Sequence, residues 1–286
     1  MARDVRVYPE VPGVGALMAR AAVTSFGRPP ASAGFPDRSM LVMSQGQDVD
    51  RLAAYNRVCG FTLSDRVSAT WLHVLTFPLQ VALMAERDFP FMLAGLVHVS
   101  NHMELHRRVL VSDRLRITVW AENMRPHKRG VTFDMNGRIH VGDDLVWSGT
   151  SRYLASKASV EGEAEASERL ELPDAPASQR WRLGSDLGRR YAAVSGDVNP
   201  IHLNPVTARL FGFPRPIIHG MWTHARALAA FGGALPETYG VDVSFTKPIL
   251  LPGKVQFATD GARFGVVNTD GTKPYLIGVL RADSAD

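Results

Sequence analysis

Two stretches of the chain have the apolar pattern of a long helix, and each precedes segments with the alternation of β-strands. One helical pattern begins at Met221 and the other at Phe77, where Pro78 fits the first turn of a helix. The following segments are rich in β-branched and aromatic residues and are separated by Gly, Asp and Asn turns. These strand-like segments are residues 115–122, 131–141, 145–155 and 241–249. A helix followed by several antiparallel strands predicts an α+β fold with the helix packed against a sheet.

A linker divides this pattern into two halves. Residues 155–178 are rich in Ala, Ser, Glu and Pro and poor in large apolar side chains, which is typical of a linker. It separates residues 37–154 from residues 179–286, after a Pro- and Gly-rich leader that covers residues 1–36. Each half has the size of an ordinary domain. We therefore predict two domains.

The two halves share motifs in the same order. Residues 55–61 (YNRVCGF) match residues 191–197 (YAAVSGD), and His73 and His219 each precede a predicted long helix. Further on, the segment that begins at Leu105 can be aligned with the segment that begins at Phe245. In this alignment apolar residues match apolar residues and basic residues match basic residues. Three ordered matches indicate an internal repeat. Between the first two matches the second half is longer.

Composition limits the function classes. Hydrophobic residues make up 45% and charged residues 21% of the 286 residues, which is the balance of a globular protein. The net charge of +4 and the scattered arginines argue against a nucleic-acid partner, but fit a phosphate-bearing ligand or an acidic carrier protein. The single cysteine, Cys59, excludes an internal disulfide, and we expect no metal site. No signal peptide and no apolar run of about 18 residues is present, so we expect a cytoplasmic protein without a membrane span.

The additional residues of the second half contain an acid/base pair. Gly196, Asn199 and Pro200 impose a tight turn, so Asp197 and His202 can face one another. Asp197 by itself would be interpreted as an Asx-turn or helix cap. A carboxylate beside an imidazole can, however, share the proton transfers that water addition to an enoyl thioester requires.

That addition also needs a donor for the thioester oxygen, which gains negative charge as the enolate forms. Gly220 lies at the predicted start of the helix after His219, where amide groups are unpaired and the helix dipole favours an anion. A glycine there lets a ligand approach the backbone closely. The amide of Gly220 is therefore the candidate donor.

Residues 191–202 (YAAVSGDVNPIH) and 211–221 (FGFPRPIIHGM) closely resemble the signature of MaoC-like hydratases, the (R)-specific enoyl-CoA hydratase 2 group. Over nearly its full length the chain is similar to two-domain mycobacterial (3R)-hydroxyacyl-thioester dehydratases. The resemblance implies a double hot-dog fold, in which an antiparallel sheet wraps each long helix. It also implies that Asp197 and His202 activate the catalytic water, that Asn199 supports the loop, and that Gly220 binds the thioester oxygen.

The first half departs from this pattern. Phe61 stands where the second half has Asp197, and the first half has no Asn-Pro-x-His sequence. A phenylalanine side chain cannot transfer protons. We therefore predict that the first domain is catalytically silent, and the resemblance implies that it provides room for a longer acyl chain.

Other residues are candidates for supporting and binding roles. Ser195 and Cys59 occupy equivalent positions, which favours a small buried residue over a nucleophile. The remaining supporting candidates are Tyr191 and His219, with His219 expected to brace the loop. The candidate substrate contacts are Phe211, Phe213 and Trp222 as apolar walls, and Arg215 and Lys247 as phosphate ligands.

The sequence thus predicts reversible hydration of a trans-2-enoyl thioester to the (3R)-hydroxy product, with no metal or redox cofactor. The substrate would be a thioester of coenzyme A or of acyl carrier protein, and a homodimer is one assembly that the resemblance allows. Two alternatives stay open: a hot-dog acyl thioesterase, and a non-catalytic subunit that binds acyl thioesters. Acyl length, physiological direction and the division of acid and base roles between Asp197 and His202 are not determined by the sequence.

Overall fold

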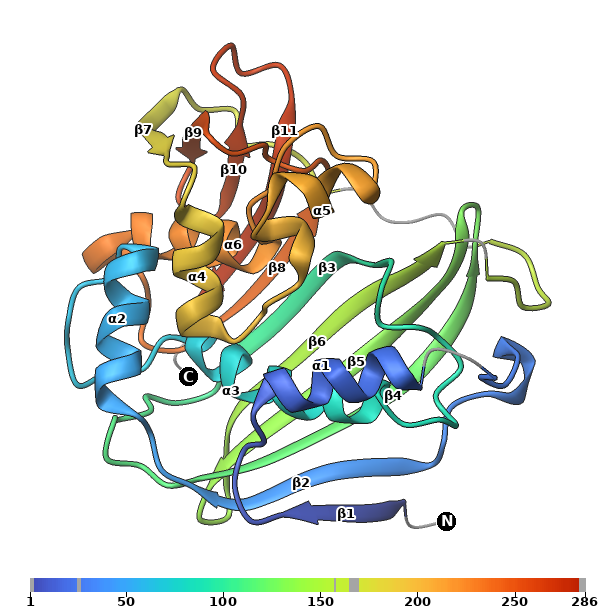
Figure 1. Ribbon diagram of the computed structural model, residues 1–286. Coiled ribbons are helices and arrows are strands. Elements are labelled where there is room, and N and C mark those ends of the chain that lie inside the picture. Colours follow the sequence, from blue (N-terminus) through green and yellow to red (C-terminus); the bar gives the residue numbers. More distant parts are fainter. Residues whose placement is uncertain (1–2, 25–26, 157, 165–169, 283–286) are drawn as a thin grey trace. The chain divides into compact units, whose positions relative to one another are not determined.

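The computed structural model describes residues 3–24, 27–156, 158–164 and 170–282 (Figure 1). The chain forms two compact units, each built from separate stretches of sequence. Unit 1 consists of Met1–Gln47, Leu72–Asn101 and Ser112–Glu168, and unit 2 of Asp48–Trp71, His102–Val111 and Arg169–Asp286. The domain boundaries predicted from the sequence stay a prediction.

Unit 1 is a sheet with the strand order β1-β2-β4-β5-β6-β3. Strands β1 and β2 pair in parallel, and the pairs from β2 through β6 are antiparallel. The strands are β1 (Asp4–Tyr8), β2 (Arg38–Gln45), β3 (Leu96–Leu105), β4 (Leu115–His127), β5 (Gly130–Val141) and β6 (Asp144–Ser156). The helices of unit 1 are α1 (Val14–Val23), the 3₁₀-helix η1 (Ala31–Ala33) and α3 (Ala69–Met84) from Leu72 onward. The segments predicted at 115–122, 131–141 and 145–155 are confirmed as strands.

Helix α3 packs closely on the inner face of this sheet. Gly137 of β5 makes the approach possible, because a Cβ atom there would lie 3.2 Å from the side chain of Thr76 and 3.1 Å from that of Trp147. Leu72, Leu79 and the neighbouring apolar side chains of α3 are fully buried. A helix that is apolar on all sides is expected at the centre of a fold.

The predicted start of this helix at Phe77 is wrong. Helix α3 begins at Ala69, and the amide of Trp71 donates to the backbone oxygen and to the Oγ atom of Ser68. His73 therefore lies inside the helix rather than before it. Pro78 is an interior residue of the helix. It has no amide hydrogen to donate to the preceding turn, and a proline at such a position typically destabilises a helix by about 3 kcal/mol. Burial of the apolar side chains around it can offset that loss.

Unit 2 contains a sheet with the strand order β8-β11-β10-β9-β7, in which all neighbouring pairs are antiparallel. Its strands are β7 (Ala177–Leu183), β8 (Tyr239–Phe245), β9 (Gly253–Thr259), β10 (Arg263–Val267) and β11 (Pro274–Ala282). Its helices are α2 (Val49–Cys59), α4 (Leu187–Ser195), α5 (Pro205–Leu210) and α6 (Gly220–Ala230), with the 3₁₀-helices η2 (Pro200–His202) and η3 (Gly232–Ala234). Helix α6 packs against the sheet, where Phe231 after its end meets Phe257 and Phe264 edge-on.

Helices α2 and α4 end in the same way, which supports the first match of the internal repeat. Gly60 follows α2 with a φ of 83° and Gly196 follows α4 with a φ of 81°. This left-handed conformation favours glycine. The residue after each glycine is the one that distinguishes the halves, Phe61 after α2 and Asp197 after α4.

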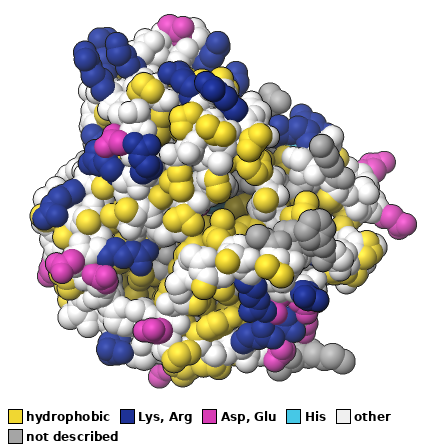
Figure 2. All heavy atoms as spheres, in the orientation of Figure 1, with side chains coloured by type: hydrophobic (Ala, Val, Ile, Leu, Met, Phe, Trp, Pro, Cys, Tyr) yellow, Lys and Arg dark blue, Asp and Glu magenta, His cyan; other side chains and the backbone are white. Residues whose placement is uncertain are grey.

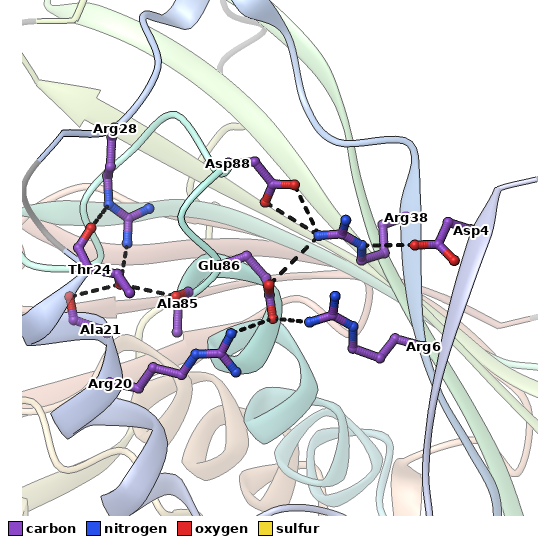
Figure 3. A network of polar contacts seen from close by, with 10 residues as sticks. All are labelled: Asp4, Arg6, Arg20, Ala21, Thr24, Arg28, Arg38, Ala85, Glu86 and Asp88. Atoms are coloured by element: carbon purple, nitrogen blue, oxygen red, sulfur yellow. Dashed lines mark hydrogen bonds and ion pairs between the residues drawn. The ribbon is translucent and has the colours of Figure 1, made fainter.

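A buried carboxylate ties the N-terminal segment to the rest of unit 1 (Figure 3). Glu86 follows α3, its side chain is 8% exposed, and one of its carboxylate oxygens lies 2.5 Å from Arg6 of β1 and 3.0 Å from Arg20 of α1. Arg38 of β2 lies 3.7 Å from the other oxygen and also pairs with Asp88. Residues within the predicted leader therefore form a strand and a helix, and the ion pairs of Arg6 and Arg20 with Glu86 connect them to the rest of the unit.

Candidate active site

The end of α4 places Asp197 in a loop that is closed by its own side chains. The amide of Asp197 donates to Ser195 Oγ (3.2 Å), and the amide of Asn199 donates to Asp197 Oδ1 (3.2 Å). Asn199 Oδ1 then accepts from the amide of Ile201 (3.4 Å) and caps η2. Ser195, Asp197 and Asn199 thus each accept from the amide two residues further on, as Asx turns and their serine counterparts do. The supporting role of Asn199 in the reaction stays a prediction.

His202 ends the turn η2 with its ring buried. Its Nδ1 atom lies 2.8 Å from the backbone oxygen of Ile217. Because a carbonyl oxygen only accepts, Nδ1 carries the hydrogen, and the neutral ring has a lone pair on Nε2. Burial lowers the pKa of His202, although the charge of Asp197 acts in the opposite direction. The imidazole is therefore a neutral base near pH 7.

Close packing between α4 and η2 fixes the position of His202. A Cβ atom at Gly188 of α4 would lie 2.1 Å from the backbone oxygen of His202, which is too close for any side chain. Only glycine therefore permits this approach of the two elements.

His219 braces the same loop from the other side. It is 2% exposed, and its Nε2 donates to the backbone oxygen of Asp197 (2.9 Å). Burial, and next the neighbouring His202, lower the pKa of His219 well below its usual value, so its ring is neutral. The Tyr191 ring lies 4.9 Å from the ring of His219, and burial raises the pKa of its phenol, which stays protonated.

Asp197, His202 and His219 form one cluster. Each places a side-chain ligand atom within 4.8 Å of the others. The two imidazole rings stack with centroids 3.6 Å apart, and the Asp197 side chain is 30% exposed. The cluster therefore consists of two buried imidazole rings and one accessible carboxylate. Such a donor set can bind a water molecule, and it also has the composition of a metal site.

Gly220 is the first residue of α6, and its amide belongs to the first turn, whose amides have no partner within the helix. A Cβ atom at this position would lie 3.0 Å from ring atoms of Phe245. The close approach of that ring gives a packing reason for glycine here. The helix dipole adds a partial positive charge at this end of α6.

The residues predicted to contact substrate have different environments. Phe211 is 48% exposed after α5, Phe213 is half-buried, and Arg215 and Lys247 are exposed. Trp222 is buried, and its indole N–H donates to the backbone oxygen of Val58 (3.0 Å). That contact is typical of a core residue. Substrate contacts of all five residues stay a prediction.

Sequence reasoning missed three contributors to the site. The first is the carbonyl of Ile217, which sets the tautomer of His202. The other two are the close contact of Gly188 with the backbone oxygen of His202 and the close contact of the Phe245 ring with Gly220. Ile217 lies within the motif before His219, but nothing in a sequence shows which carbonyl a ring will meet. The contacts of Gly188 and Phe245 arise only from packing between elements.

The MaoC like domain family matches residues 170–275. Over 234 residues the chain is 37% identical to 3-hydroxyacyl-thioester dehydratase X of Mycobacterium tuberculosis. The aligned region covers 82% of this chain and 84% of that protein.

Solved structures agree with this relationship. The crystal structure of HtdX from Mycobacterium tuberculosis matches with a TM-score of 0.76 and 34% identity, over 86% of this chain and all of that one. A protein of the same organism with a double hotdog fold, Rv0216, matches with a TM-score of 0.52 and 13% identity, over 83% of this chain and 92% of that one. The α+β double hot-dog architecture predicted from the sequence is confirmed. The chain belongs to the family of MaoC-like 3-hydroxyacyl-thioester dehydratases.

Proposed function

We propose that the protein catalyses the reversible hydration of trans-2-enoyl thioesters to (3R)-3-hydroxyacyl thioesters in fatty acid metabolism. The observation that carries this proposal is the convergence of an accessible carboxylate, Asp197, with a neutral imidazole, His202, beside the first turn of α6. The names of the related dehydratases support the same reaction class.

In the hydration direction, a water molecule held between Asp197 and His202 gives up a proton to this pair. Its oxygen forms a bond to C3 of the substrate while the C2–C3 double bond breaks. The electron pair moves onto C2 and the thioester oxygen, where the amide of Gly220 stabilises the negative charge. The proton then passes from the pair to C2. Dehydration is the same sequence in reverse.

The chemistry balances without an electron carrier, because hydration moves one proton and one hydroxide and changes no net oxidation state. We propose that the protein needs no metal or redox cofactor, and that it acts in the cytoplasm on thioesters of coenzyme A or acyl carrier protein. None of the helices among the described residues is long and apolar enough to cross a membrane. Dialysis against EDTA should leave the rate unchanged, and a loss that Zn²⁺ restores would contradict the metal-free mechanism.

The test is hydration of crotonyl-CoA, followed by loss of the absorbance of the enoyl thioester. Asp197→Asn and His202→Gln should each lower kcat by about 10²–10⁴-fold, because each removes one partner of the proton transfer. Asp186→Asn makes the same change at the N-terminal end of α4, where no side-chain cap bond forms, and should retain activity.

Near-normal turnover by Asp197→Asn or His202→Gln would refute the site. Release of free thiol from a saturated acyl-CoA would instead indicate a thioesterase. Binding of crotonyl-CoA without turnover would indicate a non-catalytic subunit.

A further inference from the structure

The surface around helix α5 exposes apolar side chains next to the active-site turn. Val206 is 64% exposed, Leu210 is 79% exposed and Phe211 is 48% exposed. Leu210 follows Val206 by four positions, so the two side chains lie on the same face of the helix. Arg209 of the same helix and Arg215, four residues after Phe211 in the sequence, are also exposed. We call these five residues the α5 platform.

The part of the sequence that contains the platform is rich in exposed arginines and poor in carboxylates. Residues 177–219 contain two carboxylates, Asp186 and Asp197, against six exposed arginines. The arginines are Arg180, Arg182, Arg189, Arg190, Arg209 and Arg215. Within the part of the chain that the structure describes, none of the six forms an ion pair with a carboxylate. Figure 2 shows hydrophobic side chains beside Lys and Arg side chains in the area where Figure 1 draws α5.

The platform is attached to the turn that holds His202. The Thr207 hydroxyl of α5 donates to the backbone oxygen of Pro200 in η2 (2.7 Å). The amide of Phe213 donates to the backbone oxygen of Ala208 (2.9 Å), and the amide of Ile217 donates to the backbone oxygen of Ile201 (3.2 Å). A partner seated on α5 would therefore sit at a fixed position relative to the catalytic pair.

The pattern of an apolar centre with a charged rim is that of a protein docking surface. The phosphates of coenzyme A could neutralise the arginines, but they offer nothing to cover Val206 and Leu210. A partner with carboxylates around an apolar patch would satisfy both features of the surface.

We propose that the α5 platform docks an acidic acyl carrier protein, which presents the enoyl group on its pantetheine arm to Asp197 and His202. This inference rests on the proposed function and specifies the partner that delivers its substrate. Coenzyme A and the carrier hold the acyl group on the same arm, so a comparison of the two isolates the contribution of the carrier surface.

The experiment measures kcat/KM for crotonyl-CoA and for crotonyl-loaded acyl carrier protein, a small acidic protein. Arg209→Glu and Leu210→Asp should each lower kcat/KM for the carrier substrate by about tenfold, through charge repulsion and through a carboxylate placed in the apolar centre. The value for crotonyl-CoA should change by less than about twofold, within the range expected for a surface substitution. Lys273→Glu makes the same charge change in an exposed turn between β10 and β11 and should affect neither substrate.

Three results would overturn the inference. Equal losses for both substrates would show that the platform supports the fold, and unchanged values for both would show that nothing docks there. A wild-type dimer in sedimentation that Leu210→Asp dissociates would identify a second copy as the occupant. Failure of the wild type to hydrate crotonyl-CoA and the crotonyl-loaded carrier alike would instead refute the proposed function on which the inference rests.

Discussion

His202 is neutral because of where its ring lies. The carbonyl of Ile217 fixes the hydrogen on Nδ1, and burial keeps the pKa of the ring below its ordinary value of 6.5. A base must be unprotonated to accept a proton from water. A lowered pKa therefore keeps His202 competent at a lower pH than an exposed histidine would be.

This predicts the acid limb of the pH profile. The value of kcat/KM for crotonyl-CoA should be constant near pH 7 and fall with a midpoint below 6.5 as His202 takes up a proton. The free energy of unfolding should fall in the same direction. The unfolded chain binds this proton at about pH 6.5 whereas the folded state resists it, so stability is lost as the pH falls from 6.5 toward the lowered pKa. A rate profile with its acid midpoint above 6.5 would contradict this account.

Two short elements, α4 and η2, flank Asp197, and η2 ends with His202. Their contact depends on one glycine. Gly188 lies against the backbone oxygen of His202, so a methyl group there must separate the helix from the turn. The displaced turn would carry His202 away from Asp197. The site therefore depends on the packing of α4 as much as on its own residues.

Gly188→Ala should lower kcat by more than about tenfold and reduce the free energy of unfolding by about 1–3 kcal/mol, the usual range for overpacking. The measurements are the crotonyl-CoA assay and urea unfolding. Gly233→Ala is the matched control, since nothing lies within 4 Å of a Cβ atom there. If Gly188→Ala has the kcat of the wild type, the positioning role of α4 is wrong.

Local features of the site could be predicted from the sequence, and non-local ones could not. The turn that contains Asp197 and Asn199 follows from residues within a few positions of one another, because Asx-type bonds are local. The sequence places the start of α3 too late, because Pro78 resembles a first-turn residue, whereas the buried surroundings of the helix tolerate it in the interior. Propensity gives way to tertiary packing in such positions.

At the scale of the whole molecule, the two units do not follow the order of the chain. The segment Asp48–Trp71, which contains α2, belongs with the C-terminal residues in unit 2. There Arg51 donates to the backbone oxygen of Val194 in α4 (2.8 Å), and the rings of Tyr55 and Tyr191 lie 6.1 Å apart. The internal repeat thus brings equivalent residues of α2 and α4 together, which the linker composition of residues 155–178 does not reveal.

Ion pairs with Glu86 hold β1 and α1 against the rest of unit 1, and their contribution to stability can be measured. The carboxylate is buried and faces three arginines on β1, α1 and β2 (Figure 3). Glu86→Gln keeps the shape but leaves Arg6 and Arg20 without their carboxylate. Because these two arginines are 40% and 46% exposed, water screens part of the loss.

We therefore expect Glu86→Gln to lower the free energy of unfolding by about 1–3 kcal/mol, less than the full cost of breaking a buried pair. Asp88→Asn is the control, since Asp88 pairs with the same Arg38 but is 51% exposed, and it should cost less than about 1 kcal/mol. Urea unfolding of the two variants measures the difference. Equal, small losses would show that β1 and α1 are held by apolar packing, because the burial of Glu86 would then add nothing to the ion pairs.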